Sequence, residues 1–179
     1  MTDRQQWAVR GEPWAEAPGH LGWLHDRARQ TLHFYHAAKN PNGGFHDLDV
    51  TRRPLPTGWP PATEAQTTLF QTTRMVHSYG IGHLSGFPGS DALVDHGMDH
   101  LWGTHRDAQH GGYFWTNGDT GPLNDSKQIY GHAFVLLAAS TAKQVGHPDA
   151  DRLLDDVVTV IDERFWEEGP GAAAEEFSA

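Results

Sequence analysis

Two clusters of polar residues in this sequence have the types and spacing needed to bind oxygen atoms and move protons. The first is Arg74 with His77, three residues apart in a stretch otherwise rich in threonine and aliphatic residues. Residues at this spacing share one face of a helix, where a guanidinium beside an imidazole can hold an oxygen and handle a proton. The structural alternative is an arginine that pairs with a carboxylate and a histidine that is bonded inside the helix packing.

The second cluster lies at the start of an apolar segment. Lys127, Gln128, Tyr130 and His132 directly precede the wholly apolar run 133–139. A helix that is apolar all round is buried between other layers, so its polar first turn faces an end of the fold. We therefore expect Tyr130 and His132 to lie at a central cleft. The alternative is that His132 caps a loop carbonyl and that Tyr130 packs against its neighbours.

A histidine-rich segment offers a weaker signal. His96 and His100 are four residues apart, a spacing at which two imidazoles can bind zinc from one helix face. The H-E-x-x-H arrangement of a catalytic zinc site is missing. We therefore expect no metal and interpret these histidines as part of a solvated outer face.

Acidic and aromatic residues gather near the glycine-rich loops. Asp47 with Asp49, or Asp119 with Asp125, could be the two carboxylates of a glycosidase, although acidic loop residues more often cap turns or face solvent. Aromatic residues in the same regions suit either stacking on a sugar or plain packing; they are Phe45, Trp59, Tyr113, Phe114 and Trp115. The sequence contains no phosphate-binding loop, nucleophile elbow or dinucleotide fingerprint.

Composition argues against several classes of protein. The 179 residues carry 13 Lys and Arg against 23 Asp and Glu, a formal net charge of −10, which disfavours binding to nucleic acid or to an anionic membrane surface. Cysteine is absent, which excludes disulfides, thiolate metal sites and a cysteine nucleophile. The amino-terminal region is charged throughout and has no central apolar run, so we expect a cytoplasmic protein without a signal peptide or membrane span.

Helices must position the candidate side chains. Residues 1–18 are polar and contain prolines, and we expect an irregular lead-in there. Apolar residues recur at helical spacing in five later segments, which are 21–39, 63–86, 91–105, 126–145 and 148–166. The aromatic and β-prone segment 111–119 contains Asn-Gly and predicts a small hairpin, and 43–49 could form a short extended piece.

Part of the sequence repeats itself. Gly86–Asp95 aligns with Gly146–Asp155, and the glycine-glycine-aromatic run at 43–45 aligns with the run at 111–113. Helical hairpins that repeat in this way stack into a solenoid or close into an α/α toroid. Two near-complete units cannot close a ring, so we expect the amino-terminal part of a longer protein. A complete five-helix domain is the alternative.

These residues resemble the N-acylglucosamine 2-epimerase superfamily, and within it the aldose-ketose isomerases of the mannose isomerase and sulfoquinovose isomerase type. The matching stretches follow one another from about residue 20 onward and are Gly43–Asp49, Thr72–Tyr79, Leu93–Gly97, His110–Phe114 and Ser126–Ser140. The resemblance implies an all-α fold, an (α/α)6 barrel that residues 19–179 fill incompletely. Short β excursions in its loops and an active site in the central cleft are further expectations.

The resemblance also implies roles for individual residues, in catalysis through a cis-enediol intermediate without metal or other cofactor. Arg74 matches an active-site arginine that stabilises charge on the sugar oxygens, and Tyr130 matches a tyrosine that holds a hydroxyl. Phe70 stands where related isomerases often have a tryptophan. The remaining candidates within or beside the matched motifs are His77 and His132 for catalysis, and Phe70 and Tyr113 for substrate contact.

The leading hypothesis is an isomerase that interconverts mannose, or a similar aldohexose, with its ketose. The resemblance places the main catalytic histidines after Ala179, so we predict a chain that is inactive alone and that self-associates through an exposed apolar edge. A 2-epimerase of N-acylglucosamine or of a cellobiose-like disaccharide is the nearest alternative. Other classes that fit are a non-catalytic helical-repeat carbohydrate-binding module and a glycosidase. A small sugar is the expected partner, with neither nucleic acid nor membrane.

Overall fold

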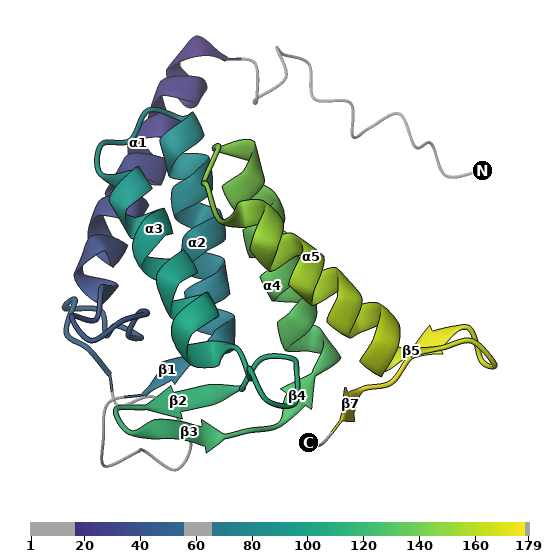
Figure 1. Ribbon diagram of the computed structural model, residues 1–179. Coiled ribbons are helices and arrows are strands. Elements are labelled where there is room, and N and C mark those ends of the chain that lie inside the picture. Colours follow the sequence, from purple (N-terminus) through teal and green to yellow (C-terminus); the bar gives the residue numbers. More distant parts are fainter. Residues whose placement is uncertain (1–16, 56–65, 178–179) are drawn as a thin grey trace, which may run out of the picture.

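Five α-helices run through the part of the chain that the computed structural model describes, residues 17–55 and 66–177 (Figure 1). Their bounds are α1 (Pro18–Tyr35), α2 (Leu69–Leu84), α3 (Ser90–His100), α4 (Ile129–Gln144) and α5 (Ala150–Val160). Each corresponds to one of the helices predicted from apolar periodicity, so the mainly helical fold class is confirmed. Most of the predicted lead-in, residues 1–16, lies outside the described residues, and α1 begins earlier than predicted.

Short turns extend three of these helices. The 3-10 turn η3 (His36–Ala38) follows α1, and π-helical turns η4 (Leu101–His105) and η5 (Ile161–Phe165) follow α3 and α5. The two π turns occupy equivalent places after the second helix of each hairpin. They account for the helical periodicity that continues beyond the ends of α3 and α5.

The start of α2 differs from the prediction for a local reason. Thr67 and Thr68 form strand β1 (Thr67–Thr68), and the Oγ1 of Thr68 caps the helix by accepting a hydrogen bond from the N–H of Gln71 at 3.1 Å. A side-chain cap of this kind satisfies one of the free N–H groups of a first helical turn. The helix therefore begins at Leu69. The predicted start at Thr63 lies outside the described residues.

The helices form two hairpins that pack side by side. Helix α2 packs on α3 and α4 packs on α5, while α2 and α4 also pack on each other. Figure 1 shows α3 and α5 in one layer over α2 and α4 in the other. Gly86 and Gly146 have φ angles of 73° and 79° in the two hairpin turns, a conformation that favours glycine. This arrangement confirms the repeat that was predicted from the sequence.

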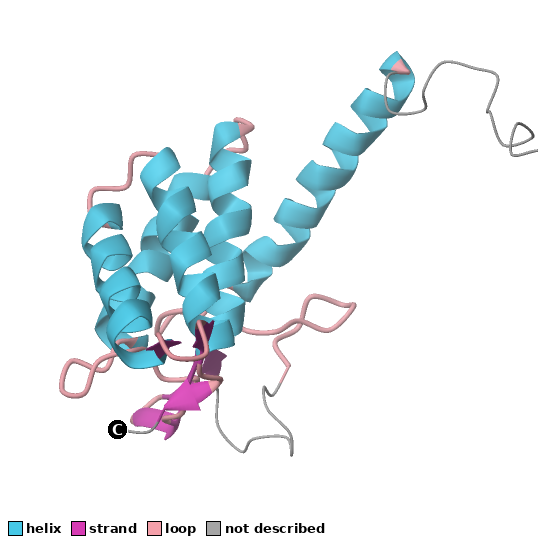
Figure 2. Cartoon of the chain, turned by 90° about the vertical axis from the view of Figure 1, so that its right-hand side faces the viewer, coloured by secondary structure: helices cyan, strands magenta, loops and turns pink. Residues whose placement is uncertain are grey.

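Helix α1 is attached to the hairpins mainly through its carboxyl-terminal half. The Tyr79 hydroxyl of α2 donates a hydrogen bond to the backbone oxygen of Leu32 at 2.8 Å. The amino-terminal half leans away from the other helices in Figure 2. Leu21 and Trp23 on this half are 47% and 50% exposed. This end of α1 is therefore an uncovered apolar face of the described chain.

Short strands gather at the amino-terminal ends of α2 and α4. Strands β1, β2 (Thr116–Gly118) and β3 (Gly121–Asn124) form one antiparallel sheet, β4 (Lys127–Gln128) pairs with β7 (Glu176–Phe177), and β5 (Trp166–Glu167) pairs with β6 (Ala172–Ala173). Segment 43–49 has no strand of its own but contributes to isolated bridges, Lys39 with Phe45 and Leu48 with Pro54.

The predicted hairpin at residues 111–119 was wrong in its position. Strands β2 and β3 turn at Asp119 and Thr120, so Asn117 and Gly118 lie in a strand. Gly111 and Gly112 have φ angles of 79° and 78° and bend the backbone sharply before β2. The pairing of β2 with β1, which is distant in sequence, decided the strand position over the local turn preference of Asn-Gly.

The core lies between the two helical layers and is filled by aliphatic and aromatic side chains. Among those that are fully buried are Leu69, Val76, Leu101, Val135, Ala138, Val157 and Phe165. No helix within the described residues is long and apolar enough to cross a membrane.

Candidate active site

A cluster of three aromatic rings and one guanidinium lies between the first two turns of α2 and those of α4. The Phe70 ring stacks on Tyr130, with centroids 5.9 Å apart and planes at 24°, and meets Phe134 edge-on at 5.5 Å. The Cζ of Arg74 lies 3.7 Å from the Phe70 centroid and 4.9 Å from the Phe134 centroid. The structure therefore brings three predicted site residues together: Phe70, Arg74 and Tyr130.

Helical spacing and the packing of the repeats build this cluster. Phe70 and Arg74 are four residues apart on α2, as are Tyr130 and Phe134 on α4, so each pair presents one face of its helix. Because α2 and α4 pack side by side, the two faces meet. Phe134 was missed in the sequence analysis. The repeat holds a signal for it, since the offset that aligns Pro88 with Pro148 also aligns Arg74 with Phe134 and Phe70 with Tyr130.

Arg74 is held in place while its hydrogen-bond donors stay available. The guanidinium lies over the two rings by cation–π contact, and its N–H groups point outward in its own plane. The residue is exposed, and no acceptor among the described residues bonds to it. Tyr130 is 51% exposed and lies beside Trp115, with ring centroids 6.4 Å apart. An exposed, oriented cation beside aromatic faces can bind an oxygen-rich ligand.

Arg74 also lines a groove of about 470 Å³ that lies along α2 and α1. Tyr35, Asp47, Gln71 and Ser78 contribute polar atoms to the same groove. Burial raises the pKa of Asp47 above its ordinary value, although the nearby His46 opposes the shift. Arg74 thus borders both the groove and the aromatic cluster.

Asp49, the possible partner of Asp47, is occupied by a turn. Its Oδ1 accepts hydrogen bonds from the N–H of Arg53 at 2.9 Å and from the N–H and hydroxyl of Thr51, each at 2.7 Å. These bonds lower the pKa of Asp49, that from the Arg53 N–H most strongly. Asp119 and Asp125 are both exposed. The geometry of these residues fits turn capping and solvation.

His77 lies one turn beyond Arg74 on α2 and faces α4. Its Nδ1 is 2.7 Å from the Oγ1 of Thr141. His77 is half-buried, whereas Arg74 is exposed. The first predicted pair therefore shares one face of α2, but each of its members has a different neighbour on α4.

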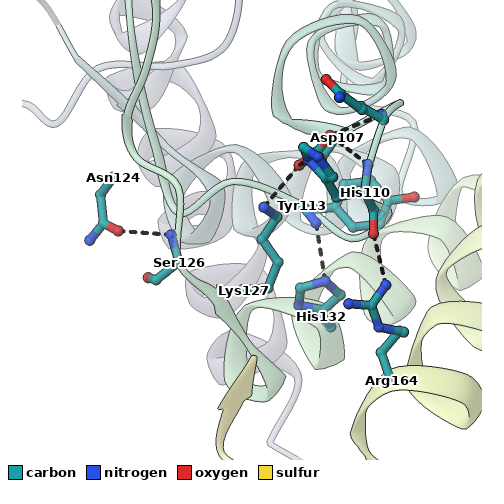
Figure 3. A network of polar contacts seen from close by, with 9 residues as sticks. Asp107, His110, Tyr113, Asn124, Ser126, Lys127, His132 and Arg164 are labelled. Atoms are coloured by element: carbon teal, nitrogen blue, oxygen red, sulfur yellow. Dashed lines mark hydrogen bonds and ion pairs between the residues drawn. The ribbon is translucent and has the colours of Figure 1, made fainter. Parts of the chain in front are cut away.

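His132 and Tyr113 lie in a second, buried cluster (Figure 3). The Nδ1 of His132 is 2.7 Å from the backbone oxygen of Gln128, and its Nε2 accepts a hydrogen bond from the N–H of Tyr113 at 3.1 Å. Burial lowers the pKa of His132 to about 4. The Tyr113 hydroxyl donates to Asp156 at 2.6 Å, and burial together with this bond raises the pKa of that hydroxyl. Both ring nitrogens of His132 and the hydroxyl of Tyr113 are therefore engaged inside the protein.

A buried ion pair supports the loop before β2. The Nζ of Lys127 lies 2.9 Å from the Oδ2 of Asp107, and both side chains are almost fully buried. Asp107 also accepts hydrogen bonds from the backbone N–H groups of Gln109 and His110, each at 3.0 Å. Although burial opposes the shift, Lys127 and the two N–H donors lower the pKa of Asp107 to about 2. Arg164 fastens the same loop by donating to the backbone oxygen of His110 at 2.9 Å (Figure 3).

The interpretation of His96 and His100 as a solvated outer face was wrong. His100 is buried with its Nε2 2.8 Å from the Oγ1 of Thr67, and the Nε2 of His96 lies 2.9 Å from the backbone oxygen of Gly44. His100 also meets the buried ring of His105 edge-on at 5.0 Å. Burial lowers the pKa of His100 to about 4 and that of His105 to about 3. The rings of His96 and His100 pack the glycine loop at 43–44 onto α3.

Metal-ligating side chains do not converge in the described ranges 17–55 and 66–177. No group of three His, Cys, Asp or Glu side chains there could hold a metal ion. Of the aromatic residues singled out in the sequence, Phe45 is fully buried, and Trp59 lies outside the described residues.

A family profile, related sequences and solved structures all relate this chain to sugar epimerases and isomerases. The sequence profile of the N-acylglucosamine 2-epimerase (GlcNAc 2-epimerase) family matches residues 43–179. A D-mannose isomerase of Thermobifida fusca is 41% identical over 167 residues, which are 93% of this chain and 39% of that protein. A crystal structure of a D-mannose isomerase superposes with a TM-score of 0.77 at 26% identity, over 88% of this chain and 39% of that one. The chain thus spans about 39% of the length of these relatives.

A structural neighbour that is named for a different enzyme activity has the same fold. The cellobiose 2-epimerase from Spirochaeta thermophila superposes with a TM-score of 0.69 at 24% identity, over 90% of this chain and 42% of that one. Together with the D-mannose isomerase structure, it places the helical hairpins in an (α/α)6-barrel type of fold, of which this chain forms a part.

Proposed function

The chain belongs to the N-acylglucosamine 2-epimerase family, and we propose that it forms the Arg74 side of the substrate cleft of a sugar isomerase that interconverts mannose, or a similar aldohexose, with its ketose. The observation that carries this proposal is the exposed guanidinium of Arg74, which is held over Phe70 and Phe134 and has no acceptor in the described part of the chain. The identity to a D-mannose isomerase supports the choice of substrate.

The cluster is suited to a pyranose or open-chain sugar. The exposed ring of Tyr130 offers apolar surface to the C–H groups of a sugar, and the Tyr130 hydroxyl can bond one of its oxygens. Proton transfer between C1 and C2 through an enediol places negative charge on the sugar oxygens. Arg74 stabilises that charge because its donors are already oriented and need no reorganisation.

We assign a structural role to His132 and Tyr113. A general base needs a free lone pair, and that of the His132 Nε2 is used by the N–H of Tyr113. Tyr113 is fully buried and cannot contact a sugar without movement of the chain around it.

His77 remains the histidine of the described residues that shares a helix face with Arg74. Because the chain spans 39% of the relative's length, we propose that it does not turn over mannose by itself.

The remaining expectations concern partners and location. We propose a small sugar as the partner, with no cofactor, nucleic acid or membrane, in a cytoplasmic protein. The net charge of −10 and the absence of cysteine support these expectations.

Mannose added to the isotope-labelled chain in deuterated water tests binding and chemistry together. We expect NMR shift changes at Arg74 and Tyr130, and neither fructose nor deuterium at C2. Binding without exchange in the chain alone also fits a binding module. The decisive test is therefore the same assay on a longer protein, in which the chain is joined to the region that the relatives have and this chain does not cover. Fructose formation there supports the isomerase, an epimeric aldose supports the 2-epimerase, and a lack of binding in both contradicts the proposal.

Substitution of Arg74 tests its role. Arg74→Ala should remove the mannose-dependent shifts and should abolish turnover in the longer version. It should lower the free energy of unfolding by only about 0.5–1 kcal/mol, since only the exposed cation–π contacts are lost. Arg74→Lys, which keeps the charge without the planar donors, is the matched control and should bind more weakly than the wild type. Normal turnover by Arg74→Ala would contradict the role of Arg74 in stabilising charge on the sugar.

A further inference from the structure

The two ring nitrogens of His77 have different environments. Its Nδ1 lies 2.7 Å from the Oγ1 of Thr141, a buried residue of α4. That oxygen in turn lies 2.9 Å from the backbone oxygen of Leu137, one turn earlier in the same helix. No group among the described residues bonds to the Nε2 of His77, and this atom is not buried.

The single hydroxyl proton of Thr141 decides which nitrogen of His77 carries the ring proton. If Thr141 donates to Leu137, the Nδ1 of His77 must be protonated and donates to Oγ1, so both short contacts are hydrogen bonds. If Thr141 donates to Nδ1 instead, its oxygen faces the Leu137 oxygen at 2.9 Å with no proton between them, which is repulsive. The first arrangement is favoured, and each bond of such a chain strengthens the next.

Close packing of α2 and α4 holds Thr141 against His77. A Cβ atom on Gly80, three residues after His77, would lie 2.4 Å from the Cγ2 of Thr141. The helices therefore approach closely at this point because residue 80 has no side chain. Thr141 has little freedom to rotate away, and its hydroxyl stays within reach of the imidazole.

We infer that Thr141 holds His77 in the Nδ1–H tautomer and thereby leaves the Nε2 lone pair as a fixed acceptor on the helix face that carries Arg74. The two nitrogens of an imidazole point in divergent directions, so Nε2 points away from Thr141. Arg74 can only donate, whereas this Nε2 can accept. If the proposed function holds, the pair meets a sugar with both kinds of partner: Arg74 binds an oxygen lone pair, and His77 accepts from a hydroxyl. Thr141 is then a positioning residue for His77.

The tautomer can be measured on the chain itself, without sugar. Long-range ¹⁵N–¹H correlation spectra of the imidazoles are recorded near pH 9, where an ordinary imidazole is neutral, and His77→Gln assigns the His77 signals. We expect the Nδ1–H pattern in the wild type and in Thr141→Ser, which keeps the hydroxyl. In Thr141→Val, which keeps the shape without it, the pattern should shift toward Nε2–H. An Nε2–H pattern in the wild type, or no change in Thr141→Val, overturns the inference.

A mannose titration then separates this inference from the proposed function. Shifts at Arg74 and Tyr130 together with a shift of the His77 Nε2 signal support both. Shifts at Arg74 and Tyr130 alone support sugar binding and overturn the acceptor role of His77. If no signal moves while the spectra show the Nδ1–H tautomer, the proposed function fails, but the positioning of His77 by Thr141 stands. Unfolding curves of Thr141→Val and Thr141→Ser show whether both variants are folded.

Discussion

At the scale of single residues, environment assigns different roles to polar side chains that look alike in the sequence. Arg74 is exposed and has no acceptor among the described residues, whereas Lys127, in the strand that leads into α4, is buried in an ion pair. One nitrogen of His77 has no partner within residues 17–55 and 66–177, whereas both nitrogens of His132 are bonded. The candidate active site therefore draws on the member of each pair that is less buried.

The buried histidines predict a pH dependence of stability. Burial lowers the pKa values of His100, His105 and His132 to about 4, 3 and 4, whereas in the unfolded chain they return to about 6.5. Between these values the unfolded state binds more protons than the native state, so acid favours unfolding. The contribution of these three neutral rings to the free energy of unfolding is fully present above pH 6.5 and falls as the pH is lowered toward 4.

Urea unfolding across this pH range checks the expectation. We expect the free energy of unfolding to fall by at least about 2 kcal/mol from pH 7 to pH 4.5. His83→Gln changes an exposed histidine and should leave this dependence unchanged. A free energy that stays constant between pH 6.5 and pH 4.5 would contradict the burial of these rings as neutral imidazoles.

At the scale of elements, the buried ion pair joins the loop before β2 to the strand that leads into α4. Lys127→Met keeps much of the volume but leaves Asp107 buried without its cation. We expect a loss of about 3–5 kcal/mol in the free energy of unfolding, the usual result when one partner of a buried pair is removed. The measurement is chemical denaturation of the single and double variants.

The double variant Lys127→Met with Asp107→Asn is the matched control for this prediction. It removes both charges, and Asn can still accept hydrogen bonds from the N–H groups of Gln109 and His110. It should therefore be more stable than Lys127→Met alone. Equal stability of the two variants would mean that the buried charge of Asp107 is not what destabilises the single variant.

Two helical glycines should respond to alanine in opposite directions. A Cβ at Gly97 in α3 would lie 2.4 Å from Val76 Cγ2, whereas Gly22 in α1 has nothing within 4 Å. Gly97→Ala should lower the free energy of unfolding by about 1–3 kcal/mol through overpacking. Gly22→Ala should raise it by up to about 1 kcal/mol, because alanine favours the helix. Thermal unfolding of both variants tests the pair, and a neutral Gly97→Ala would contradict the close packing of α3 on α2.

At the scale of the whole molecule, the described chain leaves apolar side chains uncovered at one end. Trp23 and Leu24 on α1 are 50% and 39% exposed, and Ile81 and Leu84 at the end of α2 are 49% and 58% exposed. A groove of about 440 Å³ lies between these two segments. Exposed apolar surface of this kind marks sites of association.

We therefore expect the chain to self-associate. Sedimentation velocity should show a mean mass that rises with protein concentration, and the rise should be larger at high salt, because the net charge of −10 opposes association. Trp23→Gln with Leu24→Gln should reduce it, while Val158→Gln, on a residue of α5 that is 40% exposed, is the control. A single monomeric species at all concentrations would contradict the expectation.

Much of the fold and part of the site could be predicted from the sequence. Helical periodicity indicated the five helices of the described residues, and the internal repeat indicated the two hairpins, because both patterns follow from local chain geometry. The aromatic contacts of Arg74 could be predicted less well, since Phe134 lies on another helix. The positions of β2 and β3 could not be predicted, because the pairing of β1 with β2 joins residues that are far apart in the sequence.

The order of residues along the chain indicates which segments can form helices, where the glycine turns fall and which family the chain resembles. The exposure of the polar side chains follows from the three-dimensional packing. It buried His100 and His132, paired Lys127 with Asp107, and left Arg74 exposed above two aromatic rings. Helix formation depends on neighbouring residues and can be recognised from local patterns. Burial and hydrogen bonding depend on which elements meet in space, and the packing of α2 against α4 determines that for this site.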